Sequence, residues 1–202
     1  MQKSPIGSTN HTVYNSKNVH GQYYVPRKIG EYQYEWHIFQ DRHFPLMRNW
    51  IKDRQQLSLV CSDDGDHLTE EMVNNWIQNS QIAILATKTD NHQPVGFCTL
   101  TTNEITGLPK NTIELCHLIV NPVCHYFKVG HFLCNISKYR AGFFGFQTLV
   151  GRTAKSNRFG NTLAVRESFT PIKHTVQGMR DDFNWYSFSI REVALDWGKQ
   201  VL

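Results

Sequence analysis

The residues best suited to chemistry lie in one stretch, Glu114 to Leu133, where an apolar strand pattern changes into a helical one. The strand pattern ends at Asn121-Pro122, and a helix is predicted to begin near Lys128. The first turn of a helix leaves backbone N–H groups without intrahelical partners, and the helix dipole adds positive potential there. This turn therefore predicts a pyrophosphate site, where Gly130 lets an anion approach the backbone because it has no side chain.

Three features of this stretch resemble the GNAT superfamily of acyl-CoA-dependent N-acyltransferases: the turn Val120-Asn121-Pro122, the small residue Gly130 and the apolar Leu133. Two positions depart from the family pattern. His125 stands where Arg or Gln is usual, and Lys128 stands where the first Gly is usual. Since backbone N–H groups make most of the contact there, both departures are compatible with phosphate binding.

The resemblance extends on both sides, over about residues 40 to 170. Upstream, Pro94 to Leu100 resembles a strand of the family. Downstream, Arg152 to Asn157 resembles its fifth strand and the Asn that follows, and Ser168-Phe169 stands where Gly-Phe is usual. The resemblance implies an α/β fold with a central, mostly antiparallel mixed sheet, a splayed parallel strand pair, and helices on both faces.

The resemblance also implies how acetyl-CoA, or another acyl-CoA, would bind as co-substrate. The pantetheine arm would lie between the splayed strands, against backbone groups of Leu118, Ile119 and Val120. Asn157 would lie near the thioester or the pantetheine. The loop and the first helical turn would bind the pyrophosphate through backbone N–H groups. These residues are His125, Tyr126, Phe127, Lys128, Val129 and Gly130.

Amine acylation needs a base, donors for the developing oxyanion and a proton for the departing thiolate. Glu114 is the first candidate base, because some relatives carry a catalytic Glu at this distance before Val120. The alternative is a carboxylate at a strand start that faces solvent or a lysine. His117 is the second candidate, on the opposite side of the strand from Glu114 unless a bulge intervenes. The alternative for His117 is a half-buried structural histidine. A backbone N–H near Ile119 or Val120 is the natural donor to the oxyanion.

The usual general acid of the family is absent. Many relatives carry a Tyr in the helix after the conserved Asn, where this chain has Ala164 or Leu163. Tyr139 and Tyr186 are the remaining candidates, unless the thiolate leaves unassisted, which its moderate pKa allows.

Histidines and cysteines gather around the same stretch and raise the question of a metal. They are His117, His125, His131, Cys116, Cys124 and Cys134. Their spacing matches no standard zinc motif, and a strand, a loop and a helix would scatter the ligands, so we expect no metal. Cys116 as a covalent nucleophile has no supporting motif, and a small buried thiol is the alternative.

Hydrophobic periodicity predicts the elements that position these residues: a strand, two helices, three strands, a helix, a strand, a helix and a late strand. The predicted strands are 33–39, 82–87, 95–100, 113–120, 146–152 and 185–190. The first helix shows an apolar stripe at Leu46, Met47, Trp50 and Ile51, and the second begins after an N-cap at Thr69. The third runs from about Lys128 to Gly142, and the fourth covers 157–168.

The bulk properties suit one domain over residues 31–202, preceded by a polar arm at 1–30. A net charge of +4 suits an anionic small ligand but lacks the dense basic clustering of a nucleic-acid-binding protein. Five cysteines without a CxxC pair predict free thiols in a reducing compartment. We find no apolar leader segment and no long apolar run, so we expect a cytoplasmic protein with no membrane partner.

The resemblance to the GNAT superfamily implies an N-acyltransferase that moves an acyl group, most often acetyl, from acyl-CoA to a primary amine by direct attack in a ternary complex. Alternatives are a donor with a longer acyl group or a carrier-protein phosphopantetheine, and a catalytically weak acyl-CoA-binding or sensing module. No motif encodes the acceptor, a small-molecule or peptide amine, and the sequence leaves a homodimer open.

Overall fold

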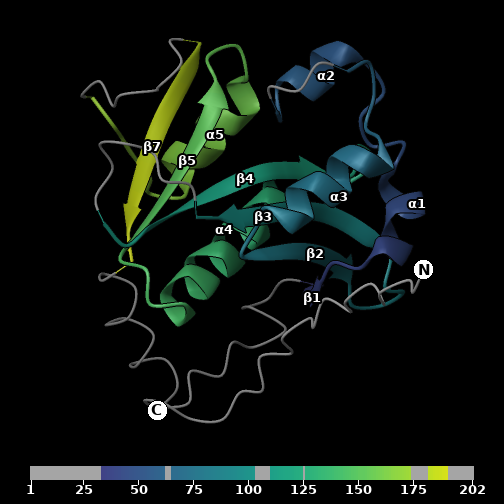
Figure 1. The fold of residues 1–202 in the computed structure, drawn as a ribbon, viewed down its shortest axis with the longest axis horizontal. Helices are drawn as coiled ribbons and strands as arrows, with labels where there is room; N and C mark the ends of the chain where they lie inside the picture. Colours follow the sequence, from purple (N-terminus) through teal and green to yellow (C-terminus); the bar gives the residue numbers. More distant parts are fainter. Residues whose placement is uncertain (1–32, 62–64, 103–109, 125, 174–181, 191–202) are drawn as a thin grey trace, which may run out of the picture.

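A seven-stranded mixed sheet forms the centre of the computed structural model, which describes residues 33–61, 65–102, 110–124, 126–173 and 182–190. The strand order is β1-β2-β3-β4-β5-β7-β6 (Figure 1). The strands are β1 Tyr34–Ile38, β2 Ile82–Lys88, β3 Pro94–Thr101, β4 Thr112–Val120, β5 Thr148–Ala154, β6 Thr170–Pro171 and β7 Phe183–Ser189. Among these pairs β4 and β5 run parallel and the others antiparallel, which confirms the predicted fold class.

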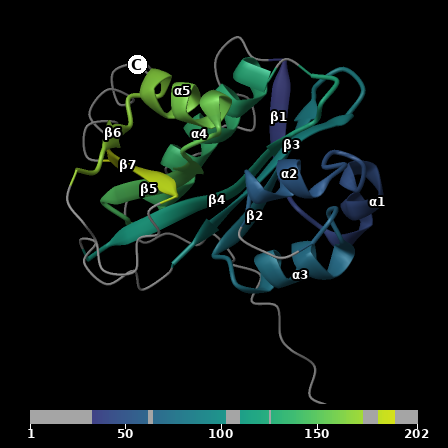
Figure 2. The ribbon, with the colours of Figure 1, turned by 90° about the horizontal axis from the view of Figure 1, so that it is seen from above.

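Helices cover both faces of the sheet (Figure 2). They are the 3₁₀ helix η1 Asp41–His43, α1 Phe44–Met47, α2 Arg54–Ser58, α3 Glu70–Gln78, α4 Tyr126–Phe143 and α5 Arg158–Arg166. The predicted N-cap of α3 is confirmed, because the Thr69 hydroxyl accepts a hydrogen bond from the Met72 backbone N–H. Asn157 caps α5 in the same way, accepting from the Gly160 N–H. In the part of the chain that the structure describes, no helix combines the length and apolarity needed to span a membrane.

Strand alternation produces two cores, one on each face of the sheet. Ile84 and Leu115 belong to the core under α4, whereas Leu85 and Phe97 belong to the core under α1 to α3. Helix α4 lies close to the sheet because β3 presents Gly96 to it. A Cβ at this position would lie 2.6 Å from Val129 Cγ1 and 2.9 Å from Leu133 Cδ1.

The parallel pair separates half-way along its length. Strand β4 pairs with β5 only as far as Leu115, which lies opposite Gly151. Beyond Gly151, β5 continues with β7, while β4 continues with β3 as far as Val120 (Figure 1). The register of β3 and β4 also shifts between Phe97 and Thr99, where His117 has a φ of 52°. The predicted splay is therefore present, and a bulge interrupts β4 within it.

The first predicted helix is wrong in its extent. The stripe of Leu46, Met47, Trp50 and Ile51 does not form one helical face, because α1 ends at Met47 and Leu46 is 57% exposed. A separate short helix, α2, follows, because the Asp53 carboxylate caps it by accepting from the Gln56 N–H. The predicted arm at 1–30 lies outside the described residues, and a single domain over 31–202 stays a prediction.

Candidate active site between β4 and β5

A cavity of about 300 Å³ occupies the gap that opens where β4 and β5 diverge. Its lining comes from both faces of the sheet. Trp76 of α3 and Asn79, the C-cap of α3, contribute from one face, and Cys134 of α4 and Leu163 of α5 from the other. Residues Cys116 to Leu118 of β4 and Gly151 to Thr153 of β5 line its walls. The cavity therefore lies in the sheet gap and is lined from both sides of the sheet.

The edge of β4 that faces this gap carries backbone groups that β5 does not pair. Asn121 donates its N–H to the Val95 carbonyl on β3 at 2.8 Å. Strand alternation then turns the backbone groups of Ile119 toward β3 and those of Val120 toward the gap. Leu118 lines the cavity. Of the three predicted backbone contacts, Leu118 and Val120 have the fitting position, whereas Ile119 faces the neighbouring strand.

His117 lies in the cavity wall on the side of α3. Its ring stacks on Trp76, with centroids 4.1 Å apart and planes within 7°. Its Nδ1 lies 2.9 Å from the Thr99 hydroxyl. A left-handed φ is unfavourable for a residue with a side chain, so the stacking and the hydrogen bond help to hold His117 at this bulge. The bulge that would turn His117 to the face of Glu114 is therefore present. The contact with Trp76 had no signal in the sequence, where the spacing of Trp76 indicated only a buried helix face.

Glu114 lies on the same face of the sheet, since its neighbours Ile113 and Leu115 belong to the core under α4. Its side chain is 2% exposed and does not line the cavity. Arg152 Nε approaches Glu114 Oε1 at 3.0 Å, and Arg152 does line the cavity. The solvent-facing alternative for Glu114 is wrong, because the carboxylate is buried in an ion pair.

Cys116, two residues beyond Glu114, lines the cavity, but its thiol is a poor nucleophile. Burial, and then the charge of Glu114, raise the pKa of the Cys116 thiol well above its usual range. The reactive form of a cysteine is the thiolate, so this environment opposes covalent catalysis. Cys116 is partly buried in the cavity wall, and its raised pKa favours the alternative of a structural, non-catalytic thiol.

On the other side of the gap, a hydrogen-bond network follows the cap of α5. Asn157 lines the cavity, and Asn161 accepts hydrogen bonds from the Tyr186 hydroxyl and the Asn184 amide, each at 2.8 Å. Tyr186 lines the cavity, and burial raises its pKa. Tyr139, the other candidate acid, packs against the core under α4 instead of lining the cavity. Tyr186 is therefore the phenol that the fold brings to the gap.

The predicted pyrophosphate site coincides with the N-terminus of α4, which begins at Tyr126. Lys128 is exposed, whereas the side chain of Val129 is fully buried in the core, so a ligand there would meet backbone groups. His125 lies outside the described residues, as do the side chains of Tyr126 and Phe127. Gly130 has a packing role that the sequence did not indicate, because a Cβ there would lie 2.8 Å from Leu163 Cδ2 on α5.

Solved structures with the same architecture decide the fold. No protein-family model matches the sequence, and no curated protein matches it either. Among solved structures, a spermidine N-acetyltransferase from Vibrio cholerae, in complex with CoA and spermine, matches with a TM-score of 0.62 and 11% identity, over 80% of this chain and 98% of that one. An N-acetyltransferase from Staphylococcus aureus Mu50 has a TM-score of 0.57 and 15% identity, over 78% and 98%. A nucleotide-linked sugar GNAT, FdhC, matches with a TM-score of 0.57 and 12% identity, over 82% of this chain and 93% of that one.

The chain has the GNAT fold. At sequence identities of 11 to 15%, the likeness establishes the fold but not the reaction, which has to be inferred from the residues of the cavity. The position where the GNAT resemblance puts the usual Tyr falls on Leu163 and Ala164, and both line the cavity without a proton to give. Within this GNAT fold, Tyr186 on β7 reaches the same cavity from the neighbouring strand.

The histidines and cysteines of residues 116–134 do not converge on a metal position within the described part of the chain. Among the described residues, a different group brings its potential ligand atoms close together: Glu35, His37 and His92. This group lies on the opposite side of β4 from β5. No sequence pattern links these three residues, because 57 positions separate Glu35 from His92.

Proposed function

We propose that the protein is an N-acyltransferase that transfers an acyl group, above all acetyl, from acyl-CoA to a primary amine by direct attack in a ternary complex. The observation that carries the proposal is the cavity in the β4–β5 gap, lined from both faces of the sheet and bordered by backbone groups of β4 that β5 does not pair. Such a gap lets a thioester and an amine meet from opposite sides. Proximity of this kind supplies much of a bimolecular rate enhancement.

The donor would enter from the side of α4 and α5. The N–H groups in the first turn of α4 suit a pyrophosphate, and the exposed Lys128 adds positive charge beside them. The pantetheine arm would then lie along β4, with amide hydrogen bonds to the open backbone groups of Leu118 and Val120. Asn157, in the cavity wall, would face the thioester end.

The acceptor would enter from the side of α3. Asn75, Trp76 and Asn79 line that part of the cavity and present amide groups and an aromatic edge. A small amine fits a cavity of this size better than a folded protein segment. The spermine complex of the Vibrio cholerae enzyme supports a small-molecule amine as the class of acceptor.

The chemistry would run through His117 and Tyr186. His117 would take the proton of the attacking amine, directly or through a water, while its Nδ1 lies 2.9 Å from the Thr99 hydroxyl. The Val120 N–H would stabilise the oxyanion as the nitrogen bonds to the carbonyl carbon. As the C–S bond breaks, Tyr186 would protonate the thiolate. We favour His117 over Glu114 as the base, because Glu114 is engaged with Arg152 and lies off the cavity.

A coupled binding and turnover experiment tests the proposal. Calorimetry with acetyl-CoA measures binding, and release of the free CoA thiol with a panel of primary amines measures transfer. We expect one site and amine-dependent thiol release, with longer acyl-CoA chains compared in the same assay. Binding without turnover across the panel would identify an acyl-CoA-binding module, and absence of binding would overturn the proposal.

A further inference from the structure

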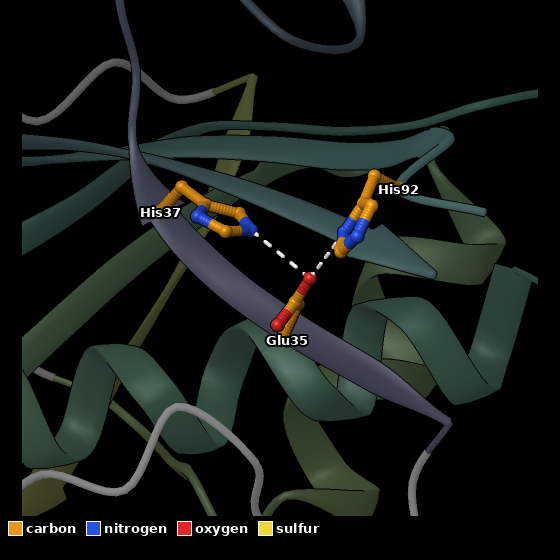
Figure 3. Close-up of side chains that lie close together, drawn as sticks. All are labelled: Glu35, His37 and His92. Carbon is orange, nitrogen blue, oxygen red and sulfur yellow. Dashed lines mark hydrogen bonds and ion pairs between the residues drawn. The ribbon is translucent and has the colours of Figure 1, made fainter. Parts of the chain in front are cut away.

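Three potential metal ligands meet at the outer edge of the sheet, away from the β4–β5 cavity. They are Glu35 and His37 of β1 and His92 of the turn between β2 and β3 (Figure 3). Their ligand atoms all lie within 4.8 Å of one another. Two imidazoles and one carboxylate form a donor set that borderline divalent metals such as Zn²⁺ prefer.

The fold brings these residues together for identifiable reasons. Glu35 and His37 are two positions apart on a strand, so their side chains share one face. Glu35 lies opposite Thr87 in the antiparallel register, near the end of β2. The turn that follows brings His92 back over the same edge, with a φ of 53°. Its N–H donates to the Lys88 carbonyl at 3.0 Å, which fixes the turn.

The distances suit a shared cation. His37 Nε2 lies 3.4 Å from Glu35 Oε1, and ligands of a tetrahedral zinc with bonds of about 2.05 Å lie about 3.3 Å apart. His92 Nδ1 lies 2.6 Å from the same oxygen, a distance that holds a proton. Replacing that proton with a metal requires the pair to separate by less than an ångström, which the exposed His92 side chain permits. The Thr87 hydroxyl, 3.1 Å from His37 Nε2, adds a neutral oxygen beside the group.

Burial and charge also favour a cation here. The Glu35 side chain is 12% exposed, whereas His37 is 34% and His92 73% exposed. A carboxylate is thus held below two more accessible imidazoles, and solvent can reach the outer side of the group. Lys88 lies opposite Tyr34, on the other face, where its charge acts on Cys124 instead. His43 faces this group electrostatically, because burial first, and then the charges of Arg42 and His37, lower the pKa of His43.

We propose that Glu35 Oε1, His37 Nε2 and His92 Nδ1 form a binding site for a zinc-class divalent cation, with an outer coordination position open to water. The bound ion would connect the edge strand β1 to the β2–β3 turn. The site is separate from the cavity in the β4–β5 gap and does not depend on the proposed acyl transfer.

Cobalt titration of the purified full chain tests this proposal, with Zn²⁺ as competitor. We expect one Co²⁺ per chain, with visible absorption bands of a nitrogen- and oxygen-ligated site that Zn²⁺ removes. Glu35→Gln and His92→Asn should each weaken Co²⁺ affinity at least about tenfold. Asn tolerates the left-handed backbone at position 92, so this variant keeps the turn.

His67→Ala is the matched control, because His67 is an exposed histidine elsewhere in the chain. It should leave the affinity unchanged, and circular dichroism should show that every variant is folded. Equal affinity in the wild type, Glu35→Gln and His92→Asn would overturn the proposal. A thiolate-to-cobalt charge-transfer band would do the same, because it would assign the metal to the cysteines.

Discussion

At the scale of single residues, the bulge at His117 decides which side chains reach the gap. A regular strand would turn His117 away from the face of Glu114, but the bulge brings it against Trp76 on that same face. The sequence ranked Glu114 first and His117 second as candidate bases on β4. We favour the reverse order, because Arg152 on the neighbouring strand engages the Glu114 carboxylate, which does not line the cavity. No local pattern in the sequence indicated this partner.

Replacement of His117 tests its role as the base. His117→Ala should lower kcat by about 10²–10⁴-fold, the usual contribution of a general base, with a much smaller change in KM for acetyl-CoA. Steady-state kinetics measure both. His67→Ala serves as the control, and a melting curve checks the fold, since the ring also packs on Trp76. Unchanged kcat in a folded His117→Ala variant would exclude this histidine as the base.

Tyr186 should act as an acid over the whole neutral range. Burial raises its pKa above the ordinary value near 10, so the phenol is protonated at neutral pH and loses its proton only at strongly alkaline pH. Tyr186→Phe should therefore lower kcat at every pH between about 7 and 9, without altering the shape of the profile. Tyr139→Phe, at a partly buried position off the cavity, is the control. A pH profile that changes shape in Tyr186→Phe would contradict this assignment.

Direct transfer predicts no acyl-enzyme at Cys116. Burial raises the pKa of this thiol, so the thiolate is scarce at neutral pH. We expect Cys116→Ala to retain turnover, and mass spectrometry of the protein incubated with acetyl-CoA alone to show no acetylated Cys116. Cys98, whose pKa burial raises to about 12, is the internal reference for an inert thiol. Stoichiometric acetylation at Cys116 that an amine then discharges would show a covalent route.

At the scale of elements, the strand–turn–helix from β4 to α4 was predictable and the packing around it was not. Asn121-Pro122 ends the strand in both the sequence and the structure, because local signals determine it. Gly130 looked like a position for ligand approach, yet its hydrogen atoms face Leu163 of α5. Helix contacts of this kind depend on which elements meet, and a single sequence does not encode that in any local pattern.

A double-mutant cycle tests the contact between α4 and α5. Gly130→Ala places a Cβ 2.8 Å from Leu163 Cδ2 and should be tolerated better when Leu163 is Ala. We expect a coupling free energy of about 1 kcal/mol in denaturant unfolding. Because Leu163 lines the cavity, Gly130→Ala alone should also weaken acetyl-CoA binding. Additive effects of the two substitutions would show that these helices do not meet at this point.

At the scale of the whole molecule, the order and spacing of individually weak motifs were sufficient to predict the fold. Groups of residues that lie far apart in the sequence could not be predicted. The strands and helices of residues 82–166 follow the predicted order, and the splay of the parallel pair was expected from the resemblance to the GNAT superfamily. In the group of Glu35, His37 and His92, 57 positions separate Glu35 from His92, and no periodic pattern links them. The acceptor side of the cavity was equally hidden, because α3 appeared in the sequence only as an amphipathic helix.

The position of acyl-CoA in the sheet gap can be measured most directly from backbone amide chemical shifts during an acetyl-CoA titration. We expect saturable shifts at Leu118 and Val120 on β4 and at Lys128 and Val129 in the first turn of α4, with one ligand per chain. Saturable shifts confined to other surfaces, with these four amides unmoved, would contradict acyl-CoA binding between β4 and β5.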